Sequence, residues 1–221
     1  MIYPTPKKWA DYIFIRYLRY LFKSDFSAIY SLKTIPEIPN NNACIITPNH
    51  SSWYDGFIVY WINKIYWKKE FRVLMLSEQL KKYYFFKNIG ACGFAPTEPK
   101  DVLKFIRYST NLIIPENIFV FFPQGKIIPE TGKPYELKLG LKLIKSNYPT
   151  EILPIHFRIV HLNERKPVLF ILPGQFIPFA EYLKDPTQLT LAMNSLQAET
   201  SQMLHQSNYG NLLAGKPINP H

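Results

Sequence analysis

The chain has 221 residues, enough for one globular domain, and its hydrophobic fraction of 47% permits a packed core and argues against a disordered chain. Lysine and arginine outnumber the acidic residues by 26 to 16, and the net charge of +10 indicates an anionic partner. The two cysteines, Cys44 and Cys92, are too few for a disulfide framework, lack metal-ligand spacing and fit a reducing cytoplasmic compartment.

The first predicted element is an amphipathic helix over residues 7–23, in which aromatic side chains are interleaved with basic ones. Aromatic rings favour the bilayer interface, while Arg16 and Arg19 favour its anionic headgroups. We therefore predict that residues 1–24 form a membrane-associating segment; the alternative is a core helix with basic edges. The two arginines interrupt the best candidate for a spanning helix, and no secretory signal pattern is seen, so peripheral association is expected.

Residues 25–221 are predicted to form a single α/β domain with a mixed sheet flanked by helices, because strand and helix patterns alternate without a dividing linker. In the expected helix 99–113, Val102, Leu103, Ile106 and Ile113 are predicted to share the apolar face. A loose end is expected around Gly210 and Gly215. The expected strands are residues 26–32, 43–47, 71–76, 90–94, 117–122, 152–160 and 168–172; the further expected helices are residues 53–63, 77–82, 139–145 and 186–204.

The most informative segment follows the predicted strand 43–47, at a place where α/β sheets commonly bind ligands. It contains His50 and Asp55, which one helical turn could bring together. An imidazole oriented by a carboxylate is the base that removes a hydroxyl proton during acyl transfer. If the alcohol attacks directly, neither Ser51 nor Ser52 is needed as a nucleophile. The alternative interpretation is that Asn49 or Ser51 caps a helix and His50 only occupies the turn.

Four blocks, in order, make residues 25–175 resemble the lysophospholipid and glycerol-phosphate acyltransferases. The first block, Asn-His-x-x-x-x-Asp, is matched by Asn49, His50 and Asp55, with Ser52 and Trp53 also in the style of the family. A Phe-Pro-Glu-Gly block is matched by Phe122, Pro123, Gln124 and Gly125. The remaining matches are the strand Ile152–Ile155, which contains a proline, and the turn Leu137–Gly140.

The resemblance implies an α/β fold on the cytoplasmic side of a membrane and a donor that is an acyl thioester of coenzyme A or acyl carrier protein. No bound cofactor is expected, and no metal is predicted because the His, Cys and carboxylate positions offer no metal-ligand spacing. By the same resemblance, His50 is the catalytic base and Asp55 orients it. The residues expected to bind substrate are Asn49, Ser52, Phe122, Pro123, Gln124, Gly125, Lys126 and Lys138.

The chain departs from the family at positions that hold a phosphate monoester. Pro96 stands where an arginine is expected, and Gln124, Lys126 and Ile127 replace the usual glutamate, threonine and arginine. Lysine offers a point charge rather than the planar fork of arginine, although Lys100 and Lys126 could compensate in part. These departures favour an acceptor without a terminal phosphate, such as a lysophospholipid with a substituted headgroup or a glycolipid.

The prediction is therefore an O-acyltransferase that moves a fatty acyl group to the hydroxyl of a lipid-like acceptor, with membrane lipids and the acyl donor as its partners. A second hypothesis, motivated by the altered blocks, is a non-catalytic lipid-binding protein on the same scaffold. Nucleic-acid binding rests on charge alone and lacks a motif, so it is not expected. His156 and His161 are interpreted as hydrogen-bonded structural histidines, and the sequence offers no basis for an oligomeric state.

Overall fold

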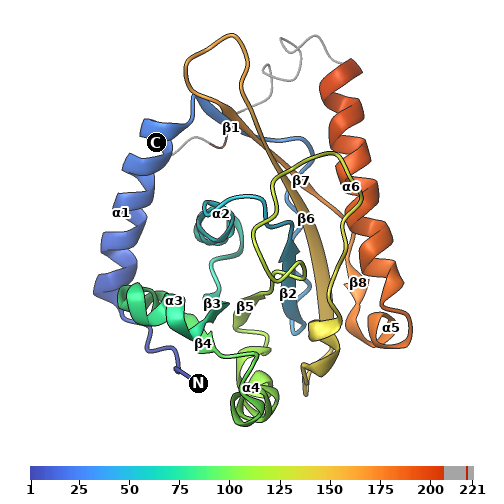
Figure 1. The fold of residues 1–221 in the computed structure, drawn as a ribbon. Helices are drawn as coiled ribbons and strands as arrows, with labels where there is room; N and C mark the ends of the chain where they lie inside the picture. The colour runs from blue at the N-terminus through green and yellow to red at the C-terminus, as the bar shows by residue number, and fades with distance from the viewer. Residues whose placement is uncertain (207–217, 219–221) are drawn as a thin grey trace.

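The structure is a computed structural model that describes residues 1–206 and 218. Within this part, one mixed sheet of eight strands has helices on both faces, which confirms the predicted α/β class (Figure 1). The predicted loose end around Gly210 and Gly215 lies outside the described residues.

The elements follow the predicted alternation closely. The helices are α1 (Lys8–Asp25), α2 (Asp55–Ile62), α3 (Ser77–Lys82), α4 (Pro99–Leu112), α5 (Phe179–Lys184) and α6 (Thr187–Gln206). The strands are β1 (Ala28–Ser31), β2 (Ala43–Pro48), β3 (Glu70–Leu76), β4 (Ala91–Phe94), β5 (Asn117–Val120), β6 (Thr150–Val160), β7 (Val168–Pro173) and β8 (Ile177–Pro178). A π-helical turn, Asn63–Trp67, extends α2, and short 3₁₀ segments span Tyr84–Ile89 and Leu139–Leu143. The helix expected over residues 139–145 is thus a shorter 3₁₀ segment.

The strand order is β1-β7-β6-β2-β5-β3-β4, and β8 pairs with β6 off this path. Strands β4, β3, β5, β2 and β6 run parallel, whereas β7 lies antiparallel to β6 and parallel to β1. After β2 the chain builds β3, β4 and β5 on one side, and it then crosses to β6 on the other side. This change of direction makes the carboxyl end of β2 the topological switch point of the sheet, the usual ligand site of such sheets.

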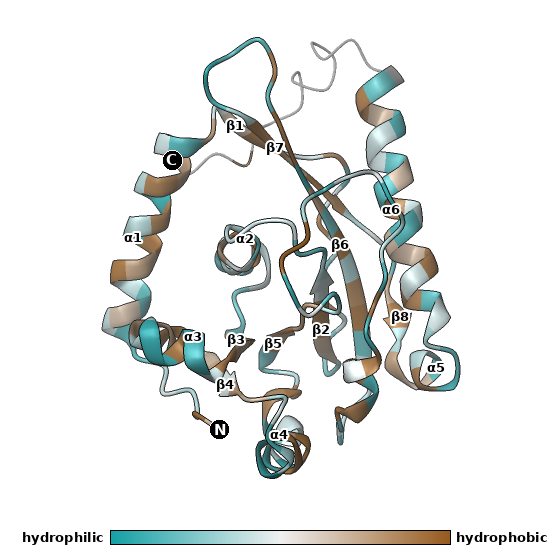
Figure 2. Ribbon diagram, in the orientation of Figure 1, coloured by the Kyte–Doolittle hydropathy of each residue, from teal (hydrophilic) through white to brown (hydrophobic). Residues whose placement is uncertain are grey.

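The sheet separates two hydrophobic layers. One layer packs α1 and α2 against side chains such as Ile46 and Leu153, and the other packs α4, α5 and α6 against Ile45 and Ile152. Strands covered on both faces read as continuous apolar runs, which is why β2 and β7 could be recognised from the sequence. Figure 2 shows hydrophobic colours on strands β3 and β5 and hydrophilic colours in the loop between β6 and β7.

Helix α1 packs through one face on α2 and the 3₁₀ segment Tyr84–Ile89, and it exposes several aromatic residues on the other. Ala10, Phe14 and Leu18 are buried, and the Asp11 carboxylate accepts a hydrogen bond from the Tyr60 hydroxyl of α2. The opposite face exposes Trp9, Tyr12, Ile13, Tyr17 and Tyr20. None of the helices in the described part of the chain has the length and apolar character needed to cross a bilayer.

Candidate active site

His50 and Asp55 lie just beyond the carboxyl end of β2, whose neighbours in the sheet are β5 and β6. His50 comes two residues after β2, and Asp55 is the first residue of α2. The intervening turn folds back because the backbone N–H groups of Ser51 and Ser52 both donate to Asp55 Oδ2, each at 2.8 Å. Local hydrogen bonding therefore brings a histidine and an aspartate five positions apart into contact.

The histidine and the aspartate form a hydrogen-bonded dyad. Asp55 Oδ2 lies 3.0 Å from His50 Nδ1 and accepts from the backbone N–H groups of Ser51 and Ser52, which occupy its lone pairs and leave it without a proton. Burial raises the pKa of the Asp55 carboxyl, and the hydrogen bonds from His50, Ser52 and Ser51 oppose that rise. Because Oδ2 can only accept, His50 Nδ1 carries the ring proton and Nε2 presents a lone pair.

The other side of the imidazole remains available to a substrate. The His50 side chain keeps 20% of its surface exposed, and Nε2 has no hydrogen-bond partner among the described residues. The Phe122 ring stacks on the imidazole with its centroid 4.1 Å away, which holds the ring plane. The arrangement suits a base that is fixed through Nδ1 and acts through Nε2.

The segment after β5 closes around the backbone of His50. The Gln124 side chain is buried, and its Oε1 accepts a hydrogen bond from the His50 backbone N–H at 2.5 Å. The His50 carbonyl in turn accepts from the backbone N–H of Ile128 at 2.8 Å, a contact that the sequence did not indicate. His50 is therefore held at both backbone groups by residues more than seventy positions away.

Gln124 also brings an unsatisfied group into the site. Its Nε2 is buried and has no hydrogen-bond partner in the described part of the chain. Since Oε1 must face the His50 N–H, the amide orientation is fixed and Nε2 cannot exchange places with it. A buried donor without a partner costs free energy, so this position is suited to a ligand oxygen.

The remaining predicted binding residues have different surroundings. Gly125 has a φ of +70°, a conformation that favours glycine, and a Cβ there would lie 3.1 Å from Lys138 Nζ. The absence of a side chain therefore allows the Lys138 side chain to pack closely against this turn. The Pro123 carbonyl accepts from the Lys138 backbone N–H at 2.8 Å. The side chains of Lys126 and Lys138 are exposed and have no polar partner among the described residues.

Asn49 and Ser52 support the turn. Asn49 is fully buried, and its side chain donates to the Phe157 carbonyl at 3.0 Å and accepts from the Phe157 N–H at 2.7 Å. Asn49 therefore ties the end of β2 to β6 and places His50. Ser52 Oγ accepts from the Tyr54 N–H at 3.1 Å, while Ser51 Oγ lies 3.4 Å from Asn49 Nδ2.

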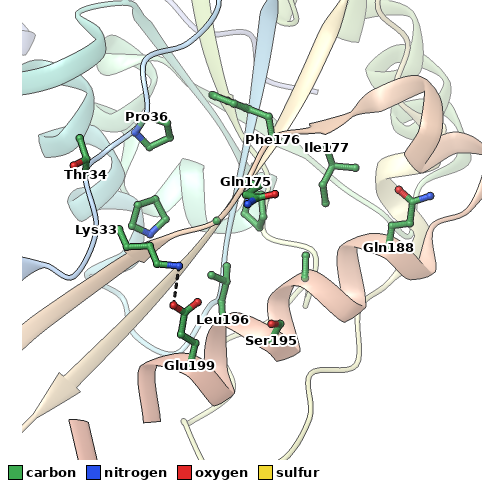
Figure 3. Close-up of a pocket in the computed structure, with 14 residues that line it drawn as sticks. Lys33, Thr34, Pro36, Gln175, Phe176, Ile177, Gln188, Ser195, Leu196 and Glu199 are labelled. Atoms are coloured by element: carbon green, nitrogen blue, oxygen red, sulfur yellow. Dashed lines mark ion pairs between the residues drawn. The ribbon is translucent and has the colours of Figure 1, made fainter. Parts of the chain in front are cut away.

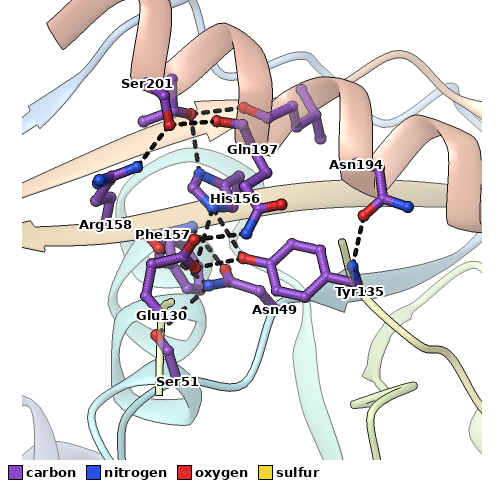
Figure 4. Close-up of polar contacts among 12 residues, drawn as sticks. Asn49, Ser51, Glu130, Tyr135, His156, Phe157, Arg158, Asn194, Gln197 and Ser201 are labelled. Carbon is purple, nitrogen blue, oxygen red and sulfur yellow. Dashed lines mark hydrogen bonds and ion pairs between the residues drawn. The ribbon is translucent and has the colours of Figure 1, made fainter. Parts of the chain in front are cut away.

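Next to Asn49 lies a cluster of buried polar residues that the sequence did not indicate as part of the site. Figure 4 shows Glu130 and Tyr135, from the connection between β5 and β6, meeting His156 of β6 and Gln197 of α6. A possible sequence signal was the pair Gln197 and Thr200, which are polar residues on the otherwise apolar buried stripe of α6.

Thiol and metal chemistry find no support in the described residues. Burial raises the pKa of the Cys44 thiol and raises that of Cys92 to about 12, so neither supplies a thiolate near neutral pH. No group of three or more His, Cys, Asp or Glu side chains in this part of the chain is placed to hold a metal ion.

A cleft of about 490 Å³ lies between α6 and the connections that follow β1 and β7, and its lining includes neither His50 nor Asp55 (Figure 3). Lys33 and Glu199 form an ion pair of 2.7 Å in its wall. Three prolines and four neutral side chains of α6 make up half of its lining residues. The chemistry of the dyad is therefore separate from this cleft.

Comparisons with known proteins agree with the fold. The family model described as Acyltransferase matches residues 30–158, which is more than half of the 221 residues. The fold is similar to the crystal structure of PlsC, the 1-acyl-sn-glycerophosphate (LPA) acyltransferase of Thermotoga maritima, with a TM-score of 0.61 and 13% identity. The match covers 90% of this chain and 81% of that chain. A search of curated protein sequences found no significant match. The matched residues include the dyad and its supporting strands, and the chain belongs to the acyltransferase family.

Proposed function

We propose that this enzyme transfers a fatty acyl group from an acyl thioester to the hydroxyl of a lysophospholipid or a similar lipid acceptor, with His50 as general base and Asp55 as its orienting partner. The observation that carries the proposal is the dyad itself, in which Nδ1 lies 3.0 Å from a buried carboxylate oxygen and Nε2 remains without a partner among the described residues. The donor would be acyl-coenzyme A or an acyl carrier protein thioester.

In this mechanism His50 Nε2 removes the acceptor hydroxyl proton as the oxygen attacks the thioester carbonyl. Asp55 stabilises the imidazolium that forms, because the hydrogen bond to Oδ2 becomes charge-assisted. Collapse of the tetrahedral adduct breaks the carbon–sulfur bond, and the imidazolium returns its proton to the leaving thiolate. The side-chain oxygens of Ser51 and Ser52 are engaged within the turn, which supports direct attack without an acyl-enzyme.

The acceptor class follows from Gln124 and from the missing arginines. PlsC of Thermotoga maritima is named for a 1-acyl-sn-glycerophosphate acceptor, and the shared fold supports an acceptor of the lysophospholipid class. In this chain Pro96 and Gln124 stand where the related enzymes carry arginine and glutamate. The unpaired Gln124 Nε2 is a neutral donor suited to a hydroxyl, ester or phosphodiester oxygen. We therefore favour an acceptor whose phosphate is substituted or absent.

The exposed face of α1 supports peripheral association with the cytoplasmic side of a membrane. Arg16 and Arg19 are exposed among aromatic side chains, and each cation near an anionic surface contributes about 1 kcal/mol. The double variant Arg16→Ala/Arg19→Ala should lose about 2 kcal/mol, roughly 30-fold, in binding to vesicles rich in phosphatidylglycerol. The matched control, Lys104→Ala/Arg107→Ala, removes two exposed cations of α4 on the opposite face of the sheet. Equal losses in both variants would contradict a specific role for α1.

The activity is tested with purified protein, long-chain acyl-coenzyme A or acyl carrier protein, and a panel of acceptors. The panel contains glycerol 3-phosphate, lysophosphatidate, lysophosphatidylcholine, lysophosphatidylglycerol and a glycolipid. We expect transfer to a substituted-headgroup acceptor and a loss of at least about 10²-fold in His50→Ala. His161→Ala, which changes an exposed histidine beyond β6, is the control and should leave turnover unchanged.

Three outcomes separate the alternatives. Full turnover in His50→Ala would refute the assigned base. Preferred transfer to lysophosphatidate would retain the dyad and overturn the acceptor assignment. Tight lipid binding without transfer from either donor would favour the non-catalytic lipid-binding protein.

A further inference from the structure

His156 lies at the centre of a buried polar cluster between β6, α6 and the connection from β5 to β6. Its side chain is fully buried, with Nδ1 at 2.9 Å from Thr200 Oγ1 and Nε2 at 3.0 Å from the Tyr135 hydroxyl. Glu130 Oε2 is 3.5 Å from Nε2 and also meets the Tyr135 hydroxyl, while Gln197 Nε2 donates to Glu130 Oε1 at 2.6 Å (Figure 4). Each of these five side chains therefore has at least one partner within the cluster.

The hydrogen bonds determine where the protons of this cluster lie. Thr200 Oγ1 is 2.8 Å from the Leu196 carbonyl, and a carbonyl cannot donate, so the hydroxyl proton points there. Thr200 can then only accept from His156, which places a proton on Nδ1. Gln197 Nε2 also donates to the Lys133 carbonyl at 3.1 Å, so the orientation of its amide is fixed and Glu130 Oε1 is an acceptor.

The same rules for donors and acceptors apply to Nε2, the second ring nitrogen of His156. Burial on its own raises the pKa of the Glu130 carboxyl, but hydrogen bonds from His156, Tyr135 and Gln197 outweigh this effect and lower the pKa to about 2. An ionised Glu130 cannot donate, so the Tyr135 hydroxyl donates to Glu130 and only accepts from His156. With Glu130 ionised, both ring nitrogens of His156 face acceptors, so the contacts fit an imidazolium paired with the Glu130 carboxylate.

This pair connects the acceptor side of the site to the rigid part of the fold. Glu130 and Tyr135 belong to the connection that also carries Gln124 and Lys126, and Figure 1 shows this yellow-green connection passing beside the central strands toward α6. The Tyr135 N–H donates to Asn194 Oδ1 of α6 at 2.6 Å. Residues 129–134 form no helix or strand, so side-chain contacts fix their position.

We propose that His156 is a positioning residue of this acyltransferase: as a buried imidazolium it holds Glu130 and Tyr135, and thereby fixes the segment Gln124–Tyr135 on the acceptor side of the dyad. Neither His156 nor Glu130 takes part in proton transfer to the substrate. A buried ion pair that loses one partner leaves an uncompensated charge, so removing either member should release the segment. The position of Gln124 Nε2, and with it the affinity for the acceptor, depends on this pair.

The charge state is tested first, on the intact enzyme and without substrate. In ¹⁵N-histidine-labelled protein at neutral pH, the ring nitrogens of His156 should both give the signals of protonated imidazolium. The exposed histidines His161 and His205 give comparison signals in the same spectrum. A His156 ring with one unprotonated nitrogen would overturn the proposal whatever the enzyme acylates.

The kinetic test rests on the proposed acyl transfer and uses Glu130→Gln and His156→Gln. In both variants the acceptor KM should rise about tenfold, while the KM for the acyl thioester should change less than twofold. A purely structural role would lower the active fraction, and hence kcat, with both KM values unchanged. Glu164→Gln, at an exposed position in the loop after β6, is the control for the loss of a carboxylate and should leave the acceptor KM unchanged.

These outcomes separate the two proposals. Protonated His156 signals without any acyl transfer would overturn the proposed function and leave the imidazolium in place. Protonated signals with unaltered acceptor KM in both variants would overturn the positioning role. If both variants fail to fold, Tyr135→Phe replaces them, because it removes the hydroxyl that joins His156 to Glu130 and should also raise the acceptor KM.

Discussion

The substitution Asp55→Asn separates two roles that an aspartate can have beside a catalytic histidine: fixing the tautomer of the ring and stabilising its charge. Asp55 Oδ2 accepts from the backbone N–H groups of Ser51 and Ser52, each at 2.8 Å, and from His50 Nδ1 at 3.0 Å. In the asparagine variant an NH₂ group cannot face two backbone donors. The amide oxygen must therefore occupy the position of Oδ2, where it can still accept from His50 Nδ1.

This geometry sets the expected size of the effect. The tautomer of His50 is retained, so the variant loses only the difference between a charge-assisted and a neutral hydrogen bond, which is about 1–2 kcal/mol. The expected loss in kcat is then about 5- to 30-fold. Where an asparagine allows the wrong tautomer, as in the Ser-His-Asp triad, the loss is about 10⁴-fold. Asp55→Ala should lose at least about 10³-fold, because it leaves the ring without an acceptor and two N–H groups unsatisfied.

The assay is single-turnover transfer from acyl-coenzyme A with each variant, after circular dichroism has shown that it is folded. Asp25→Asn is the control, because the Asp25 carboxylate also accepts a hydrogen bond, from the Tyr54 hydroxyl at 2.5 Å, but does not touch His50. A loss near 10⁴-fold in folded Asp55→Asn would refute the reasoning that Ser51 and Ser52 fix the orientation of the side chain. Unchanged kcat in both Asp55 variants would remove Asp55 from the mechanism.

Three further predictions concern acceptor binding, acid stability and a strained turn. Gln124→Glu removes the unpaired Nε2 donor, so kcat/KM for the preferred acceptor should fall about 5- to 10-fold with the thioester KM unchanged; an unchanged acceptor KM would show that Nε2 does not contact the acceptor. Glu130 has its pKa lowered from 4.5 to about 2, so its stabilising contribution is complete above pH 4.5 and is lost as the pH falls through about 2. Over that range the wild-type free energy of unfolding, measured with urea, should fall by on the order of 3 kcal/mol more than that of Glu130→Gln; parallel curves would contradict the pairing. Gly90→Ala should destabilise the fold by more than about 2 kcal/mol, because Gly90 has a φ of +108° and a Cβ would lie 1.8 Å from the Phe71 carbonyl oxygen; an unchanged urea midpoint would contradict this steric argument.

The parts of the fold that the sequence predicted are those set by local pattern. β2 and β7 are buried along their whole length, so each appears as an uninterrupted apolar run. The order of the strands and the antiparallel pairing of β6 with β7 depend on contacts between distant segments, which no local pattern encodes. The short elements β8 and α5 were missed, since two and six residues carry too little periodicity for either to be recognised.

The predicted apolar face of α4 was wrong at Leu103 and right at Ile113, and the difference has a physical reason. Leu103 was expected to be buried and is 56% exposed, whereas Phe105, Ser109 and Leu112 form the buried face. Ser109 sits there because its hydroxyl accepts from the Lys145 N–H and donates to the Ile106 carbonyl. A periodicity built only from apolar residues misplaces a face that contains a satisfied polar residue.

The contacts of the site also fall into two groups: local ones that the sequence predicts, and ones between distant residues that it does not. His50 and Asp55 are five positions apart and meet within one turn, so their contact was predictable. Gln124 reaches the His50 backbone across 74 positions of sequence, and its position was suggested only by the resemblance. Glu130 and His156 also come from separate segments of the chain, and neither residue belongs to a recognisable block. Those contacts come from the fold and not from a motif.

The geometry also explains how the acceptor could change while the dyad stays the same. The base is built within one turn after β2, and the groups that fix its orientation are the Ser51 and Ser52 backbone N–H groups and Asp55. The acceptor side comes from the segment after β5, in which Phe122 stacks on the imidazole, whereas Gln124 and Ile128 meet His50 through its backbone groups. Substitutions at residues 124–127 can therefore alter which headgroup is bound without disturbing the imidazole. The replacement of the expected glutamate by Gln124 therefore affects which acceptor is acylated. The unchanged His50–Asp55 pair determines how the hydroxyl proton is removed.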